Sequence, residues 1–306
     1  MKVDIYGDGI GCVEYVQHSG DDVTIVNAAR VSFGKQKETL DEKDKKLIRY
    51  LIKHKHTSTL EHNTITFRFT VPLFIRSQHH RHRTWSYNEI SRRYTSVDIR
   101  FYEPLEFRVQ HKSNRQASDD KYIDPLICYK TANDTGLSAN VSALLKNHHK
   151  TCVALYDAMM NSGICREQAR GVLPQNLYTE YFGTVNLNNL LKFIELRLHE
   201  GAQYEIRQVA QACLEIATNI WPESVSAYRE IKLATEANPI MDYFLKIDPS
   251  LFFLVKFLLV SISAIFLYAN RHVMLARYAL LGGVALYTMV NMFHVYGFIF
   301  LEGRFI

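Results

Sequence analysis

Residues 65–94 of this chain read ITFRFTVPLFIRSQHHRHRTWSYNEISRRY. The first seven of these residues alternate between apolar and polar side chains, which is typical of a strand with one buried face. Pro72 ends the alternation and suits the first turn of a helix, and the Leu-Phe-Ile that follows can anchor that helix. The stretch therefore predicts a buried strand–helix corner, and binding sites are commonly built on loops with such rigid supports.

Residues 78–94 emerge from this corner and combine arginine, histidine and aromatic side chains with one carboxylate, that of Glu89. So many cations repel one another unless an anion lies among them. Guanidinium groups bind phosphate oxygens in pairs, and flat rings stack on flat rings, so the stretch predicts a pocket for a phosphate-bearing aromatic small molecule. Three other interpretations stay open at this point: Arg-rich aromatic stretches also bind nucleic acid, closely spaced histidines also hold metals, and a charged stretch can simply be solvated surface.

The spacing within the stretch is more specific. Arg81-His82-Arg83, followed after seven residues by Ser91, resembles the R-H-R-x7-S signature of flavin-dependent thymidylate synthases. Four further segments resemble the same family in the same order, and the resemblance covers roughly residues 1–235; these segments are Ala28–Phe33, His56–His62, Arg170–Thr179 and Glu195–Arg207.

The resemblance implies an enzyme that makes dTMP from dUMP by reductive methylation. It implies 5,10-methylenetetrahydrofolate as carbon donor and FAD, reduced by NADPH, as hydride donor. The family activates the uracil ring without a cysteine adduct, and the signature stretch contains no cysteine. Family members are homotetramers whose active sites draw on several subunits, so we also expect a homotetramer, a cytoplasmic catalytic domain and no nucleic-acid partner.

The resemblance also implies roles for individual residues. Arg197 matches the catalytic arginine that stabilises the ionised N3 of dUMP, and no metal ligand is implied. The residues that match dUMP contacts are Gln78, Arg81, Glu89, Ser91, Arg92, Arg93, Arg170 and Arg197. The residues that match FAD contacts are Ser58, Arg81, His82, Arg83, Glu89, Asn186 and Asn188. Asn188 and Lys192 occupy flavin-contact positions but differ in residue type from relatives, as does Arg92, where relatives often have glycine.

Composition and element order give the fold class. The 306 residues carry a net charge of +5 and are 47% hydrophobic, which excludes a disordered chain and a highly basic nucleic-acid coat. The five cysteines form no CxxC pair, which favours reduced thiols in a cytosolic protein. Strands mix with helices without a regular βαβ rhythm, so we expect an α+β fold with a mixed or antiparallel sheet flanked by helices.

Outside the corner, Thr39 and Glu42 suggest a capping box at the start of a helix that ends near residues 53–56. We expect an exposed, turn-rich segment over residues 110–136. The other predicted elements are strands over 97–108 and 177–185 and helices over 138–160, 186–199 and 204–220.

The last part of the chain has a different character. Residues 251–269 carry one charge, and residues 278–300 carry none, so as helices they would be about 28 and 34 Å long, enough to span a membrane. We therefore predict a catalytic domain over residues 1–240 and a two-helix membrane hairpin within residues 241–306. The main rival to the enzyme is a membrane-tethered nucleic-acid-binding protein that uses residues 78–94, and a second is a metal-dependent hydrolase that uses the histidines.

Overall fold

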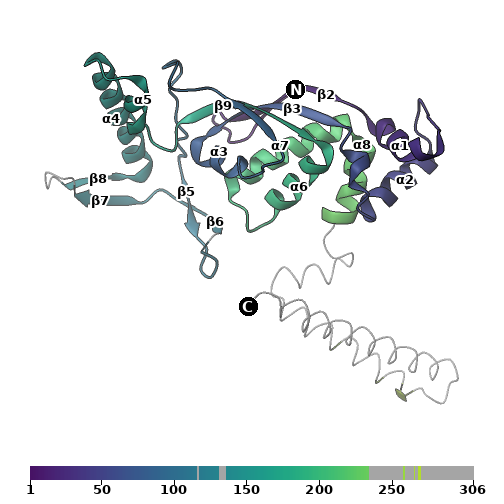
Figure 1. Ribbon diagram of the computed structural model, residues 1–306. Coiled ribbons are helices and arrows are strands. Elements are labelled where there is room, and N and C mark those ends of the chain that lie inside the picture. The colour runs from purple at the N-terminus through teal and green to yellow at the C-terminus, as the bar shows by residue number, and fades with distance from the viewer. Residues whose placement is uncertain (116, 131–135, 234–257, 259–264, 266–267, 270–306) are drawn as a thin grey trace, which may run out of the picture. The chain divides into compact units, whose positions relative to one another are not determined.

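The predicted strand–helix corner is at the centre of the fold (Figure 1). The computed structural model describes residues 1–115, 117–130 and 136–233, together with residues 258, 265, 268 and 269. Five strands form an antiparallel sheet in the order β1-β2-β3-β9-β4. These strands are β1 Lys2–Asp4, β2 Cys12–Ser19, β3 Thr64–Pro72, β4 Ser86–Glu89 and β9 Tyr178–Asn186.

Strands β3 and β9 pair along their whole length, with Thr64 opposite Asn186 at one end and Pro72 opposite Tyr178 at the other. Pro72 then serves as the N-cap of α3, Leu73–His79. The strand is extended because its apolar residues fill the core, and Phe67 and Phe69 are fully buried. The corner is therefore fixed by both packing and backbone pairing.

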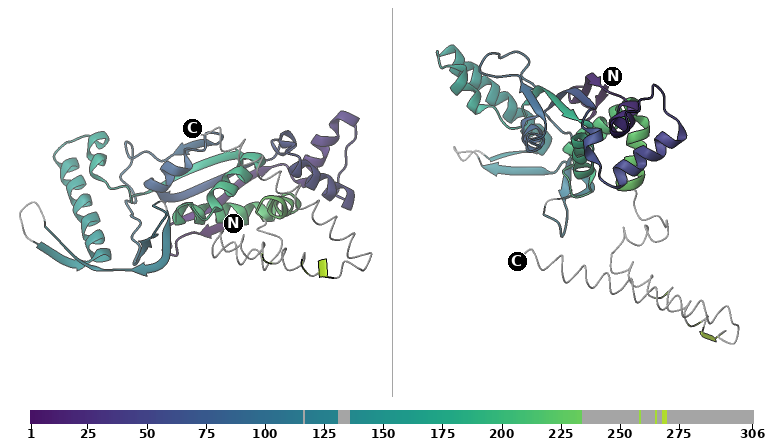
Figure 2. Two further views of the ribbon diagram at one scale, coloured as in Figure 1. Left: turned by 90° about the horizontal axis from the view of Figure 1, so that it is seen from below. Right: turned by 45° about the vertical axis from the view of Figure 1, so that its right-hand side comes forward.

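Helices α6, Leu187–Leu198, and α7, Tyr204–Ile220, lie against one face of the sheet (Figure 1). In α6 the fully buried Leu187, Leu190 and Ile194 recur at helical spacing, so one stripe faces the core. Three further helices gather at one end of the sheet (Figure 2): α1 Asp22–Arg30, α2 Glu42–Lys53 and α8 Pro222–Tyr228. The single-turn helices are η1 Val31–Phe33, η2 Thr57–Leu60, η3 Arg170–Val172 and η4 Arg229–Leu233.

The capping box of α2 is formed by Asp41 and Asp44, so the prediction of Thr39 and Glu42 was wrong. The Asp41 carboxylate accepts from the backbone N–H groups of Lys43 and Asp44 at 2.8 and 2.9 Å, and the Asp44 carboxylate accepts from the Asp41 N–H at 3.0 Å. A carboxylate in the first turn also interacts favourably with the helix dipole.

The segment between β4 and β9 carries hairpins and a long helix. Its elements are β5 Phe107–Gln110, β6 Ser118–Ile123, β7 Leu126–Lys130, β8 Gly136–Asn140, α4 Val141–Asn161 and α5 Arg166–Ala169. The strand predicted over residues 97–108 was wrong over most of its length: only Phe107 and Arg108 lie in a strand, and Phe101 forms an isolated bridge with Leu177. At its start, Asp98 has φ of +60°, and the carbonyls of Val97 and Asp98 accept from Arg92. Within this segment, Nδ1 of His149 in helix α4 lies 2.8 Å from Oε1 of Glu103, which precedes β5.

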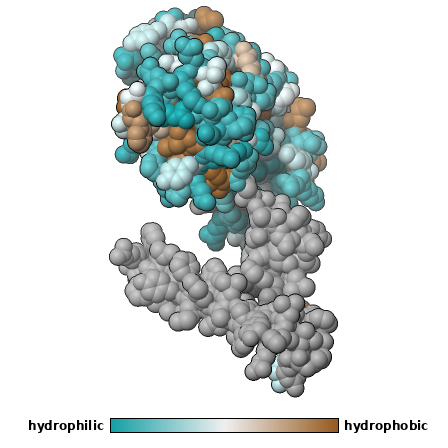
Figure 3. All heavy atoms as spheres, turned by 90° about the vertical axis from the view of Figure 1, so that its right-hand side faces the viewer, coloured by the Kyte–Doolittle hydropathy of each residue, from teal (hydrophilic) through white to brown (hydrophobic). Residues whose placement is uncertain are grey.

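The observed architecture confirms the predicted α+β class with an antiparallel sheet flanked by helices. Residues Met1–Leu233 form one compact unit, and Ala234–Ile306 form a second. Figure 3 shows a face of the first unit that is largely hydrophilic, with hydrophobic patches between hydrophilic residues. The predicted hairpin at 251–300 lies almost entirely outside the described residues, and within those residues no helix is both long and apolar enough to cross a membrane.

Candidate active site

The cationic stretch is held by the sheet over much of its length. After α3 and a short loop, Ser86–Glu89 pair with Tyr181–Thr184 of β9, and the Ile90 N–H donates to the Glu180 carbonyl at 2.9 Å. The sequence analysis expected a loop on a rigid support here, whereas Ser86–Glu89 form a strand. Pairing with β9 fixes the direction of each β4 side chain, and the Glu89 side chain is half-buried.

His79 fastens the stretch to the core. Its Nδ1 lies 2.8 Å from the hydroxyl of Tyr181, and its carbonyl accepts from the hydroxyl of Tyr87 at 2.9 Å. The rings of Trp85 and Phe193 pack against the imidazole. Burial holds the pKa of His79 well below its usual value, so the imidazole is neutral and acts as a structural anchor.

A cavity of about 460 Å³ lies between α3, the end of β4 and η3. Glu89 is held there, since its Oε1 accepts from the Thr179 hydroxyl at 2.7 Å and pairs with Nε of Arg76 at 3.2 Å. Sequence analysis assigned no role to Arg76, which carries no motif, or to Thr179, which ends the segment Arg170–Thr179 that resembles the family. The predicted dUMP-binding residues that line the cavity are Glu89, Ser91, Arg92 and Arg170.

The arginines around this cavity differ in how they are paired. Arg92 donates to the carbonyls of Val97 and Asp98, the latter at 3.1 Å, so its guanidinium already has partners. Arg93 is exposed and lies 3.7 Å from a carboxylate oxygen of Glu167. Arg170 is exposed and forms no side-chain hydrogen bond or ion pair with any described residue, so its guanidinium is available to a ligand.

Arg197 belongs to a second polar group. Its Nε donates to Nε2 of His82 at 3.0 Å, and its Nη2 donates to the backbone carbonyl of Gln78 at 3.3 Å. Burial, followed by the charge of Arg197, lowers the pKa of His82 to about 4. His82 is therefore neutral and accepts at Nε2, which places its hydrogen on Nδ1. Burial and the charge of Arg81 lower the pKa of Arg197, but a guanidinium stays protonated in a protein.

The two polar groups are separate among the described residues. Arg76 contacts Glu89 at the 460 Å³ cavity, whereas the backbone carbonyl of Gln78 accepts from Arg197 and the Gln78 side chain bonds to Gln203. Neither Gln78 nor Arg197 lines the cavity that holds Glu89 and Arg170.

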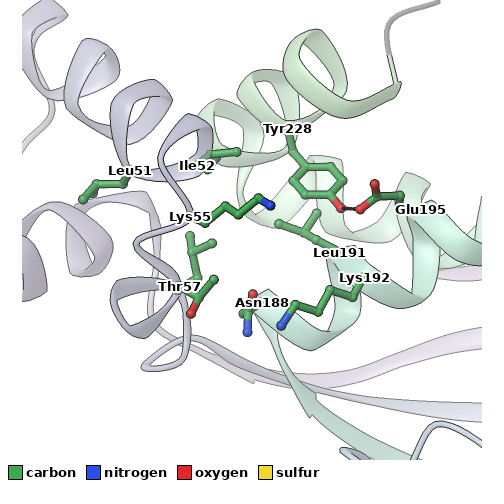
Figure 4. Close-up of a pocket in the computed structure, with 10 residues that line it drawn as sticks. Leu51, Ile52, Lys55, Thr57, Asn188, Leu191, Lys192, Glu195 and Tyr228 are labelled. Carbon is green, nitrogen blue, oxygen red and sulfur yellow. Dashed lines mark hydrogen bonds between the residues drawn. The ribbon is translucent and has the colours of Figure 1, made fainter. Parts of the chain in front are cut away.

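The predicted FAD contacts fall at several places. Asn188 is buried, donates to Glu61 at 3.1 Å and lines a second cavity (Figure 4). Asn186 caps α6, since its Oδ1 accepts from the Asn189 N–H at 2.9 Å. Ser58 is exposed in η2. Two more of the predicted contacts, Arg81 and Arg83, are exposed and form no ion pair with any residue that the structure describes.

The histidines do not assemble into a metal centre in the described part of the chain. No three His, Cys, Asp or Glu side chains are close enough together there to hold an ion. His80 stacks on Tyr87 at a ring-centroid distance of 4.0 Å, and His82 bonds to Arg197, so both imidazoles have other contacts.

Comparison with known proteins identifies the family. A family described as thymidylate synthase complementing protein matches residues 14–223. A flavin-dependent thymidylate synthase of Thermus thermophilus is 42% identical over 220 residues, which cover 72% of this chain and 76% of that protein. The chain belongs to the flavin-dependent thymidylate synthase family. The resemblance inferred from the Arg81–Ser91 signature is thus confirmed.

Other relatives agree with this family assignment. A flavin-dependent thymidylate synthase of Kosmotoga olearia is 37% identical over 218 residues, covering 71% of this chain and 90% of that protein. The solved UMP/dUMP methylase PolB from Streptomyces cacaoi, bound with 5-Br UMP, is 29% identical with a TM-score of 0.59 and covers 73% of this chain and 96% of its own. A second family, described only as a domain of unknown function, matches residues 226–300.

Proposed function

We propose that this chain is a flavin-dependent thymidylate synthase that converts dUMP to dTMP by reductive methylation. Its carbon donor is 5,10-methylenetetrahydrofolate, and its hydride donor is FAD reduced by NADPH. The observation that carries the proposal is the 460 Å³ cavity at which Glu89, Ser91 and Arg92 of the signature meet the distant Arg170. Phosphate, sugar and ring groups of a nucleotide require this mixture of cations, hydroxyls and a carboxylate.

In this proposal the phosphate of dUMP lies at Arg170. The guanidinium there has no partner among the described residues, so its donors can form paired bonds to phosphate oxygens. Ser91 adds a hydroxyl, and Glu89 keeps Oε2 as an acceptor, because Thr179 and Arg76 both bind Oε1. The remaining proposed dUMP contacts are Gln78, Arg81, Arg92, Arg93 and Arg197.

Arg197 is the proposed catalytic residue. Contacts with His82 and with the Gln78 carbonyl orient its guanidinium, so the cation is preorganised. A fixed cation beside N3 of uracil favours loss of the N3 proton, and each unit by which the pKa of N3 falls corresponds to about 1.4 kcal/mol. The ionised ring is electron-rich at C5, the carbon that receives the one-carbon unit.

The proposed FAD contacts have groups that suit the cofactor. Arg81 and Arg83 offer exposed guanidinium groups to a diphosphate, and Asn188 places an amide in a cavity. His82 and Asn186 already use one polar atom each within the chain, which leaves Nδ1 and Nδ2 for the flavin. Ser58 and Glu89 complete the set. When bound, FAD supplies the hydride that reduces the transferred unit to a methyl group.

We propose a homotetramer with active sites shared between subunits. The support is that Arg197, the proposed catalytic residue, does not line the cavity at which Glu89, Ser91 and Arg170 meet. A second copy could bring the Arg197 group of one subunit to the Glu89 cavity of another. A protein kept monomeric should then bind FAD and dUMP poorly, which size-exclusion chromatography with a flavin titration measures. Full flavin binding by a monomer would contradict shared sites.

We also propose that residues 251–300 attach the cytoplasmic catalytic domain to a membrane. The support is the length and low charge of the two predicted spans. Flotation of the full chain with lipid vesicles tests this, and the protein should rise with the vesicles in high salt. Release by salt alone would indicate a surface contact.

The direct test of the enzymatic proposal uses the full chain purified in detergent. The protein should be yellow, NADPH should bleach its flavin absorbance, and dTMP should form from dUMP only when methylenetetrahydrofolate is present. UMP serves as the comparison substrate, because a relative of known structure is a UMP/dUMP methylase. A colourless protein that forms no dTMP would refute the proposal.

A further inference from the structure

Helix α7 carries a buried carboxylate in its first turn, that of Glu205, which is 4% exposed. Its Oε1 accepts from Nη2 of Arg108 at 2.7 Å and from the hydroxyl of Tyr102 at 3.3 Å. Its Oε2 accepts from Nε2 of Gln203 at 2.9 Å. A carboxylate offers acceptors only, so every group that faces it must present a donor.

This carboxylate decides which way the amide of Gln203 faces. Gln203 directly precedes α7 and is half-buried. The oxygen and nitrogen of an amide have nearly the same shape, so its contacts determine which of the two faces each neighbour. The nitrogen of Gln203 must face Glu205, and its Oε1 therefore faces the other way and accepts from Nε2 of Gln78.

Gln78 connects this pair to the proposed active site. Its backbone carbonyl accepts from Nη2 of Arg197 at 3.3 Å, and its side chain is a proposed dUMP contact. With one Nε2 hydrogen committed to Gln203, the Gln78 amide keeps Oε1 and its second Nε2 hydrogen for a ligand. Reversal of the Gln203 amide would reverse that of Gln78 as well, and would turn its oxygen inward.

We propose that Glu205 is a positioning residue for dUMP, which acts through Gln203 to fix the orientation of the Gln78 amide. The inference rests on the proposed function, since it takes Gln78 as a dUMP contact. Glu205 lines neither of the two cavities described above, and two hydrogen bonds separate it from the Gln78 amide. Sequence analysis assigned no role to Glu205 or Gln203.

Arg108, in β5, holds the Glu205 carboxylate in place. Its Nε donates to the Ser118 hydroxyl at 3.0 Å, and its Cζ lies 4.5 Å from the centroid of the Tyr204 ring. The guanidinium is thus fixed by two contacts besides the carboxylate, and it has donors but no acceptor. A side chain at position 205 must therefore direct an oxygen toward Arg108.

Glu205→Gln uses this constraint to test the proposal. The amide at position 205 directs its oxygen toward Arg108 and its nitrogen toward Gln203, so the amides of Gln203 and Gln78 turn over in sequence. The affinity of the full-length, FAD-loaded protein for dUMP, measured by calorimetry, should fall by about tenfold, the effect of one lost hydrogen bond. FAD content should stay at the parent level. An unchanged affinity for dUMP would overturn the proposal.

Glu103→Gln is the matched control. It makes the same change at a carboxylate that contacts His149 and forms no bond to Gln203. The affinity of this variant for dUMP should equal that of the parent. Equal losses of affinity in the two variants would show a general effect of removing a carboxylate, and would also overturn the proposal.

An exchange of the two residues separates positioning from folding. In the double variant Gln203→Glu with Glu205→Gln, the carboxylate at position 203 accepts from the amides on both sides. The Gln78 amide then turns back to its original orientation, so the affinity for dUMP should recover to within about threefold of the parent value. A purely structural role predicts no recovery, because the ion pair with Arg108 stays broken. Absence of recovery would therefore overturn the proposal.

Gln78→Ala provides a second check through a double-mutant cycle. If Glu205 acts through Gln78, then Glu205→Gln should have no further effect on dUMP affinity once position 78 is alanine. Additive losses would mean that Glu205 acts by another route, contrary to the proposal. All of these measurements depend on binding and not on turnover. A parent protein that binds dUMP but forms no dTMP would refute only the proposed reaction, whereas one that binds no dUMP would overturn both.

Discussion

Two regions of this molecule concentrate charge, and they balance it in opposite ways. At the corner between α1 and α2, the fully buried Asp44 pairs with Arg30 and Lys37, and Lys37 also bonds to Asp41. Arg81 lies in the signature stretch, and Arg170 lies far from it in sequence. Neither arginine forms an ion pair with a carboxylate among the described residues. A balanced cluster stabilises the fold, whereas an unbalanced one is available to an anionic ligand.

The largest expected effect tests the catalytic side of this comparison. Arg197→Ala should lower the turnover number by about a thousandfold, because a preorganised cation beside the reacting ring is lost. FAD content should stay at the parent level. Steady-state kinetics and the visible flavin spectrum measure the two quantities, and loss of the flavin would mark Arg197 as a structural residue.

The next effect tests the balanced cluster. Asp44→Ala should lower the free energy of unfolding by about 2–3 kcal/mol in urea titrations, since it leaves two partly exposed cations without their buried partner. The remaining folded enzyme should turn over normally. Glu42→Ala, which removes an exposed carboxylate from the same helix, should change stability by less than about 0.5 kcal/mol. Equal losses in both variants would contradict a special role for the buried charge.

Removing an unpaired cation should weaken substrate binding and leave the stability of the fold unchanged. Arg170→Ala should raise the KM for dUMP by about thirtyfold, because paired bonds to phosphate are lost, and should leave thermal stability unchanged. Arg166→Ala is the control, since Arg166 donates to Ser96 at 3.3 Å and does not line the 460 Å³ cavity. A large fall in melting temperature for Arg170→Ala would show that the residue serves the fold.

The smallest effect concerns pH. Burial lowers the pKa of His82 to about 4, whereas an unfolded histidine titrates near about 6.5. Between these values the unfolded chain binds more protons, so the contribution of His82 makes stability fall as pH drops from about 6.5 to 4. His82→Gln should flatten this slope, and His62→Gln, which removes an exposed imidazole, should not. Urea titrations at several pH values measure both slopes.

The sequence predicted the elements that carry their own periodicity. The apolar alternation before Pro72 and the helical spacing in residues 186–220 were read correctly because packing against the core enforces both patterns. Strand β4 was missed because backbone bonds to β9, not side-chain pattern, create it. The strand predicted at 97–108 also failed because of a contact that no local pattern shows: the Arg92 side chain donates to the carbonyls of Val97 and Asp98.

For the candidate site, the signature indicated which residues gather but not how they are oriented. Glu89, Ser91, Arg92 and Arg170 do line one cavity. The support of Glu89 by Arg76 depends on the register between β4 and β9, which no local pattern encodes. Likewise, the bond from Arg197 to His82 joins residues far apart in sequence, and only the packed fold brings them together.

Arg197 does not line the cavity that holds Glu89 and Arg170, and this separation has a genetic consequence. If each active site borrows one half from a neighbour, damage to either half is confined to the sites that contain it. Subunits disabled at Arg170 and subunits disabled at Arg197 could then assemble into mixed oligomers in which a fraction of the sites has two intact halves. A cell expressing both defective copies could grow without added thymidine, although neither copy alone would support it.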